Sequence, residues 1–179
     1  MRAGEVALRE VLTKADMALA FAIREVVFIL EQSVPLDEEV DGLDERARHV
    51  LLEVDGLGVG TGRVLPPSGP GMAGGAYHLG RIAVLKEWRG QGLGTVIVRA
   101  LEALSLADLE AKGGHGQVEV DLAAQTHALG FYRRLGYTVH GRTYPDAAID
   151  HRDAIRLVRR EDTVPHPTPG ADPPALPRP

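Results

Sequence analysis

A glycine-rich segment is the part of the sequence whose residue types and spacing best suit chemistry. It reads Arg89-Gly90-Gln91-Gly92-Leu93-Gly94 and lies between an apolar stretch and a long amphipathic pattern. Glycines at such a junction permit a tight turn and let a ligand approach the backbone closely. The free N–H groups and the positive end of the helix that follows attract phosphate. The segment predicts a pyrophosphate-binding loop, and an ordinary strand-to-helix connection remains the alternative.

Two other phosphate-binding loops do not fit these residues. A P-loop needs Gly-Lys-Ser/Thr, which does not follow the glycines. A dinucleotide-binding fingerprint needs Gly or Ala where Ile97 stands. The segment therefore favours neither a P-loop enzyme nor a Rossmann enzyme.

Side chains that could move protons are available, whereas thiol and metal chemistry is not expected. The chain has seven histidines and no cysteine, which excludes disulfides and a cysteine nucleophile. No His-x-His or His-Glu-x-x-His pattern is present, so we predict no metal.

Negative charge is concentrated in residues 31–45, which hold seven acids and no Lys or Arg. One interpretation is a solvated loop, and the other is an acidic rim that attracts cationic amines. The acids are Glu31, Asp37, Glu38, Glu39, Asp41, Asp44 and Glu45.

Alternating and helical patterns predict a mixed α/β domain that positions these residues. Thr13 and Asp16 form a helix-start pattern, and Asp55-Gly56 favours a tight hairpin turn. The first helix should end before Pro35 and face the core with Leu19, Ile23, Val26, Val27 and Leu30. Strands are expected at 5–12, 49–54, 57–65, 77–85, 117–123, 137–144 and 152–159, helices at 92–111 and 126–135, and a surface loop at 66–76.

Length and composition limit the classes of protein to consider. The 179 residues suit one domain, assigned to 1–160, followed by a Pro-rich C-terminal tail at 161–179. The net charge of −5 argues against nucleic acid as a partner. No apolar run suits a signal peptide or a membrane span, so we expect a soluble, cytoplasmic protein without a membrane partner.

Beyond the glycine loop, the sequence resembles the GNAT (Gcn5-related) N-acetyltransferase superfamily. Arg89, Gly92 and Gly94 match its Arg/Gln-x-x-Gly-x-Gly/Ala hallmark, and Phe131-Tyr132 through Gly136-Tyr137 matches its Phe-Tyr-x-x-x-Gly-Phe/Tyr segment. The resemblance spans roughly residues 5 to 160. Within the superfamily the ElaA-like bacterial subgroup is the most similar, through residues 24–32, Val34-Pro35, Asp41, His49, residues 80–84, Ala124-Gln125 and Asp150-His151.

This resemblance implies the GNAT acyl-CoA N-acyltransferase fold, an α/β (α+β) arrangement with a mixed, mostly antiparallel twisted sheet flanked by helices. It also implies direct transfer of acetyl from acetyl-CoA, as co-substrate, to a primary amine of a small molecule or peptide. By analogy Tyr132 protonates the leaving thiolate, and the alternative for Tyr132 is an aromatic packing role. His49 and His151 are candidate bases, with a structural role as the alternative, and Glu31 is a candidate base or amine anchor. The residues implied in cofactor binding are Ile82, Ala83, Val84, Arg89, Gly90, Gln91, Gly92, Leu93, Gly94, Thr95, Gln125 and Tyr132.

Four questions stay open at the level of sequence. Many superfamily members place Asn where this chain has Gln125-Thr126-His127, so a contact made by that Asn does not carry over. The alternatives to acetyl transfer are an acyltransferase for a longer acyl-CoA and a non-catalytic CoA-binding regulatory module. The acceptor and a homodimeric state are likewise undetermined.

Overall fold

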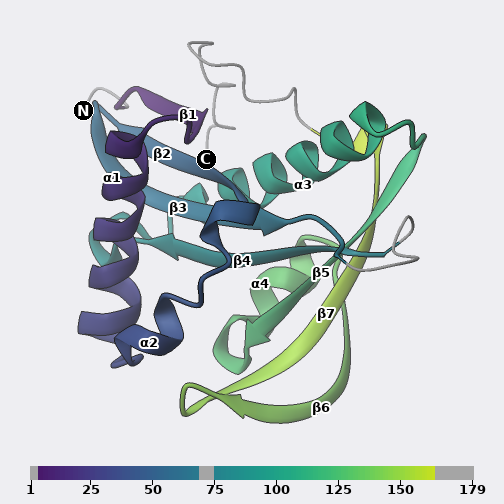
Figure 1. Ribbon diagram of the computed structural model, residues 1–179. Coiled ribbons are helices and arrows are strands. Elements are labelled where there is room, and N and C mark those ends of the chain that lie inside the picture. Colours follow the sequence, from purple (N-terminus) through teal and green to yellow (C-terminus); the bar gives the residue numbers. More distant parts are fainter. Residues whose placement is uncertain (1–3, 69–74, 164–179) are drawn as a thin grey trace.

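The computed structural model describes residues 4–68 and 75–163, which form one seven-stranded sheet with helices on both faces (Figure 1). The strand order is β1-β2-β3-β4-β5-β7-β6. Only β4 and β5 run parallel, and every other neighbouring pair is antiparallel, which confirms the expected mixed, mostly antiparallel sheet. The strands are β1 Val6–Glu10, β2 Arg48–Val54, β3 Leu57–Leu65, β4 Tyr77–Val84, β5 Gln117–Gln125, β6 Thr138–Asp146 and β7 Ile149–Arg159.

Three helices begin and end close to the predicted positions, and the short helix at Leu36–Glu39 was not predicted. The helices are α1 Lys14–Arg24, which continues as a π-helix over Glu25–Glu31, α2 Leu36–Glu39, α3 Leu93–Ala111 and α4 Leu129–Arg134. The predicted helix start is confirmed, because Thr13 and Asp16 exchange the two hydrogen bonds of a capping box. Short 3₁₀ turns occupy Asp44–Arg46, Lys86–Trp88, Thr126–Ala128 and Arg160–Asp162.

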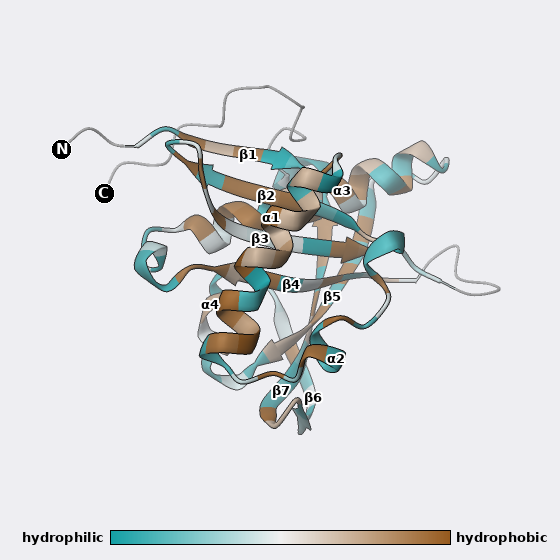
Figure 2. Cartoon of the chain, turned by 60° about the vertical axis from the view of Figure 1, so that its left-hand side comes forward, coloured by the Kyte–Doolittle hydropathy of each residue, from teal (hydrophilic) through white to brown (hydrophobic). Residues whose placement is uncertain are grey.

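The two faces of the sheet are covered by different helices, as the alternation of β2 requires. Leu52 packs in the large core with α3, whereas the adjacent Leu51 packs with Ile23 and Val27 of α1 and its π-helical continuation. In Figure 2 most of α1 has the tan and brown colours of apolar residues. The helix α3 lies so close to β3 that a Cβ on Gly60 or Gly62 would meet Ile97 at 2.8 Å.

The predicted apolar stripe of the first helix is only partly correct. Val26 and Leu30 are 42% and 71% exposed, whereas Ile23 and Val27 are buried. The helix changes to π geometry at Glu25, and the i→i+5 hydrogen bonds of a π-helix widen the turn. After Glu25 the 3.6-residue stripe on which the prediction was based is therefore kept by Val27 and lost by Val26 and Leu30.

Other predicted elements differ mainly at their ends. The Asp55-Gly56 turn is confirmed, with φ of 51° and 77°. The strand predicted at 117–123 continues to Gln125, and the last strand begins at Ile149 rather than 152. In the predicted loop 66–76 and the predicted tail 161–179, residues 69–74 and 164–179 lie outside the described residues.

Candidate active site

The central feature of the site is a gap between β4 and β5. The two strands pair only over Tyr77–Leu79 and Val120–Leu122. Beyond this short contact β4 pairs with β3 alone and β5 with β7 alone, and the two strands diverge (Figure 1). Each strand therefore turns one unpaired backbone edge toward the gap. A cleft of about 1050 Å³ opens there.

A bulge in β4 borders this cleft. In the β3–β4 register Thr61 lies opposite Ala83 and Arg63 opposite Gly80, so Arg81 and Ile82 together face only Gly62. Arg81 has a φ of +52°, which is unusual for a bulky side chain. Arg81, Ile82, Ala83 and Val84 all line the cleft.

The glycine-rich loop connects the end of β4 to α3. Gly90 and Gly92 have φ of 77° and 80°, which glycine adopts without strain. Within the described residues no hydrogen bond is donated by the N–H groups of residues 90–94. The first turn of α3 therefore offers free donors, as the sequence predicted. Arg89 lines the cleft, whereas residues 90–95 do not.

Glu31 and Arg89 form an ion pair across the end of β4. Both carboxylate oxygens of Glu31 bind the Arg89 guanidinium, and Arg89 Nε donates to the carbonyl of Val84 at 2.8 Å. The hydrogen bonds from Arg89 lower the pKa of Glu31. A carboxylate held in this way is a weak base at neutral pH, so these contacts do not favour Glu31 as the general base.

Tyr132 lies on α4 and lines the cleft opposite β4. Its ring makes edge contacts with Phe131 and Tyr137, at centroid distances of 5.0 and 5.8 Å. Burial raises the pKa of Tyr132 to about 12, so the hydroxyl keeps its proton at neutral pH. Gln125 also lines the cleft and donates to Gln32 Oε1 at 2.8 Å.

The two candidate histidines have different surroundings. His151 lines the cleft, with Nδ1 2.8 Å from the carbonyl oxygen of Ile149. His49 is 3% exposed and does not line the cleft. Its Nε2 lies 3.1 Å from the carbonyl oxygen of Asp44, and burial lowers its pKa. His127, which sequence reasoning did not select as a candidate, does line the cleft.

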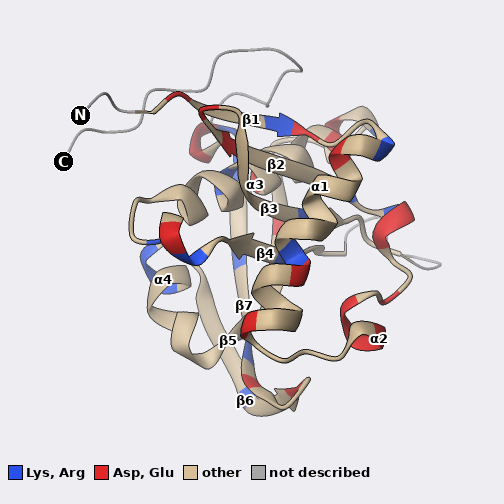
Figure 3. Ribbon diagram, turned by 90° about the vertical axis from the view of Figure 1, so that its left-hand side faces the viewer, with Lys and Arg blue, Asp and Glu red and all other residues tan. Residues whose placement is uncertain are grey.

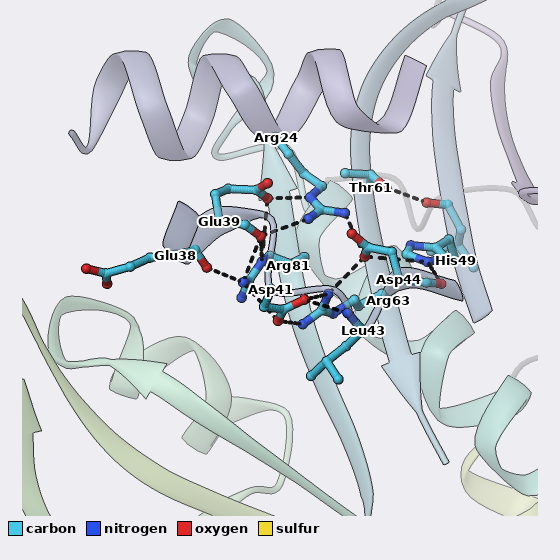
Figure 4. A network of polar contacts seen from close by, with 11 residues as sticks. Arg24, Glu38, Glu39, Asp41, Leu43, Asp44, His49, Thr61, Arg63 and Arg81 are labelled. Carbon is cyan, nitrogen blue, oxygen red and sulfur yellow. Dashed lines mark hydrogen bonds and ion pairs between the residues drawn. The ribbon is translucent and has the colours of Figure 1, made fainter. Parts of the chain in front are cut away.

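The acidic stretch divides into paired and unpaired carboxylates. Glu39, Asp41 and Asp44 form ion pairs with arginines (Figure 4). Within the described residues Asp37 and Glu38 make no ion pair, and both line the cleft. Figure 3 shows acidic residues gathered on α2. The acidic rim is therefore smaller than the sequence suggests, because the arginine partners Arg24, Arg63 and Arg81 lie outside the stretch.

Residues 4–68 and 75–163 contain neither a cluster of metal ligands nor a helix suited to span a membrane. Among them no group of three or more His, Asp or Glu side chains is arranged to hold a metal ion. In the same ranges no helix combines the length and apolar character that a membrane span requires.

Comparisons with known proteins agree with this geometry. A family model described as an acetyltransferase (GNAT) domain matches residues 45–139, more than half of the chain. An uncharacterized N-acetyltransferase of Bacillus subtilis, YjcF, is 37% identical over 152 residues, covering 83% of this chain and 99% of the relative.

Solved structures show the same fold. An acyl-CoA N-acyltransferase from Pseudomonas aeruginosa matches with a TM-score of 0.68 and 28% identity, covering 85% of this chain and 99% of that one. ElaA of Escherichia coli matches with a TM-score of 0.67 and 22% identity, covering 84% of this chain and 99% of that one. The protein has the GNAT acyl-CoA N-acyltransferase fold, and the chain belongs to the GNAT acetyltransferase family.

Proposed function

We propose that the protein transfers the acetyl group of acetyl-CoA directly to a primary amine of a small molecule or peptide. The observation that carries this proposal is the gap between β4 and β5, which reaches from Arg89 to Tyr132 within one cleft. Its two open strand edges suit an extended ligand that makes backbone hydrogen bonds. A cysteine-free chain also suits direct attack by the amine, because no thiol is available to carry the acyl group.

The chain's own residues fit acetyl-CoA. Residues 89–95, which include the free N–H groups at the start of α3, would hold the pyrophosphate. The free edge of Ile82, Ala83 and Val84 would pair with the pantetheine, and a backbone N–H of the bulge would face the developing oxyanion. Acetyl-CoA supplies the activated thioester.

Proton movement is assigned to two side chains that line the cleft. Since the Ile149 carbonyl only accepts, Nδ1 of neutral His151 carries the proton and Nε2 is left as an acceptor. His151 is therefore the base that we propose for the amine. Tyr132 lines the cleft and keeps its proton at neutral pH, so it is the group that we propose to protonate the departing thiolate. His49 has no part in this scheme because it does not reach the cleft.

The acceptor proposed here is a cationic amine. Asp37 and Glu38 from α2 and Asp146 from the β6–β7 hairpin all line the cleft and make no ion pair in the described part of the chain. Unpaired carboxylates on two walls attract an ammonium group by long-range electrostatics. Apolar side chains of the cleft, among them Val27 and Phe28, favour a longer acyl-CoA as the second candidate co-substrate.

Release of CoA in the presence of an amine library tests the proposal. Acetyl-CoA and octanoyl-CoA should be compared, with mass spectrometry of the N-acyl products. We expect N-acetyl products with diamines or basic peptides ahead of neutral amines. Tight binding of acetyl-CoA without any N-acyl product across the library would instead favour the regulatory module.

A further inference from the structure

Arg81 links two parts of the cleft that the sequence keeps far apart. One part is the bulge of β4, formed by Arg81 and Ile82 opposite Gly62. The other is the acceptor wall, the name used here for residues 36–44, which include α2 and the acids that line the cleft. We infer that Arg81 is a positioning residue that holds the acceptor wall against the bulge, and this inference rests on the proposed amine transfer.

The contacts of the Arg81 guanidinium are directed almost entirely at the acceptor wall. Nη2 donates to the carbonyl oxygens of Glu38 and Glu39, both at 2.9 Å, and Nε donates to the carbonyl oxygen of Glu39 at 3.2 Å. Nη2 also lies 3.1 Å from Asp41 Oδ2. The carbonyls are those at the end of the short helix α2, where intrahelical partners are missing. One side chain therefore binds both the helix end and the acid that follows it.

The backbone at Arg81 is held in a strained conformation. Its φ of +52° is one that glycine adopts freely and a long side chain rarely adopts. Such strain persists where surrounding contacts over-determine the backbone, and these positions cluster at functional sites. A glycine would form the bulge without strain, but it would lose every contact to the acceptor wall.

Two buried arginines also form ion pairs with acids of the acceptor wall. Arg24 is 1% exposed and binds Glu39 and Asp44, whereas Arg63 is 3% exposed and binds Asp41 and Asp44 (Figure 4). Three arginines thus balance three carboxylates. Removing either buried arginine would take one cation from a buried network in which each carboxylate has two arginine partners, and this would threaten the fold.

Arg81 also lines the cleft, and it differs from these two because its side chain is 24% exposed. Water can replace part of its hydrogen bonding. Arg81 is therefore the member of the network whose loss should move the wall without unfolding the protein.

The decisive variants are Arg81→Gly, which removes the tie and relieves the strain, and Arg81→Lys, which keeps the charge but cannot bridge the carbonyls. Amide hydrogen exchange of residues 36–44 should accelerate about tenfold or more in Arg81→Gly, since several hydrogen bonds are lost. With an acceptor in hand, its KM should rise about tenfold while the Kd of acetyl-CoA changes less than about twofold. In Arg81→Lys the increase in hydrogen exchange at 36–44 and the increase in acceptor KM should both be smaller than in Arg81→Gly.

Arg9→Ala is the matched control. Arg9 is 31% exposed, pairs with Glu53 and Asp16, and does not line the cleft. The Arg9→Ala variant should leave the amide hydrogen exchange of residues 36–44 and the KM of the acceptor unchanged. Unchanged exchange at 36–44 in a folded Arg81→Gly would overturn the inference. If the wild type acylates no amine, the proposed function fails, and the exchange comparison still decides the role of Arg81.

Discussion

Glu31 accepts hydrogen bonds from both terminal nitrogens of the Arg89 guanidinium, at 2.6 and 2.8 Å. The pair joins the end of the π-helix to the first residue of the glycine-rich loop. The guanidinium is thus neutralised close to the place proposed for the pyrophosphate.

Glu31→Gln is expected to strengthen acetyl-CoA binding a few-fold at low salt, because it releases the charge of Arg89 toward phosphate. The gain should shrink at high salt, and the pH profile of kcat above about pH 6 should not move, since the pKa of Glu31 is already lowered. Calorimetry at two salt concentrations measures the effect. Glu25→Gln is the control, because Glu25 is exposed and does not line the cleft. Weaker binding in Glu31→Gln would show that Glu31 orients Arg89 for the ligand.

Tyr132→Phe tests the proposed proton donor. The ring contacts with Phe131 and Tyr137 remain, and only the hydroxyl is lost. We expect kcat to fall about 100-fold with acetyl-CoA affinity nearly unchanged. Tyr77→Phe also removes one hydroxyl, at a site outside the cleft where it binds Asp108, and should leave kcat intact. Equal kcat in Tyr132→Phe and the wild type would reduce Tyr132 to a packing residue.

Gly92→Asp is expected to abolish acetyl-CoA binding. The position has a φ of +80° and lies just before α3, so a side chain there adds strain and negative charge at the proposed phosphate site. Gly113→Asp is matched, since Gly113 has a φ of +86°, follows the other end of α3, and likewise has open space where a Cβ would stand. Calorimetry should show binding lost only in the first variant. Retained affinity in a folded Gly92→Asp would remove the loop from the binding site.

Glu102 on α3 should make stability depend on pH. It is fully buried, accepts from Tyr137 at 2.9 Å, and is bound by Arg99 and Arg156. Burial raises the pKa of Glu102 to about 7, against 4.5 as the ordinary value. Between these values the folded protein holds a proton that the unfolded chain has lost. This contribution to stability is therefore present at low pH and is lost as the pH rises toward 7.

Urea unfolding at about pH 5 and about pH 8 measures this contribution by comparison with Glu102→Gln, which cannot titrate. The measured quantity is the free energy of unfolding of Glu102→Gln minus that of the wild type. This difference should be larger at the higher pH by up to about 3 kcal/mol. Histidines titrate in both proteins and cancel in the difference. A difference that does not vary with pH would mean that Glu102 stays charged throughout.

The described start of the C-terminal segment contributes to stability. Asp162 Oδ2 accepts from the backbone N–H of Arg159 at 3.0 Å and lies 3.5 Å from Arg156 Nη2. A chain that ends at Arg160 should therefore be less stable than one that ends at Thr163 by about 1 kcal/mol, or a few degrees in Tm. Asp162→Ala in the longer chain should reproduce the loss. Equal Tm values for the two chains would place the domain boundary at Arg160, as the composition suggests.

Local signals in the sequence predicted the local structure well. The capping box at Thr13 and the turn at Asp55-Gly56 depend on a few adjacent residues, and both are present. The exposure of Val26 and Leu30 was not predictable, because the change to π geometry breaks the helical period within a continuous apolar run.

Contacts between residues far apart in the chain could not be predicted from the sequence. The acids at 39–44 look like a solvated or ligand-facing run until Arg24, Arg63 and Arg81 are brought to them from a helix and two strands. The pairing of Glu31 with Arg89 likewise spans 58 positions. The order of charges along the chain shows where acids are concentrated, whereas the fold determines which arginine pairs with each acid.

The brief pairing of β4 with β5 also shapes how the domain behaves as a thermodynamic unit. Three aligned positions join the half-sheet β1–β4 to the half-sheet β5–β7–β6, and α3 packs against strands of both halves. The direct strand pairing between the two halves is therefore short, and α3 and the Gln125–Gln32 hydrogen bond add further links between them. A strand-like ligand bound between the diverging edges would form hydrogen bonds with both β4 and β5. Part of its binding free energy would therefore stabilise the contact between the two half-sheets.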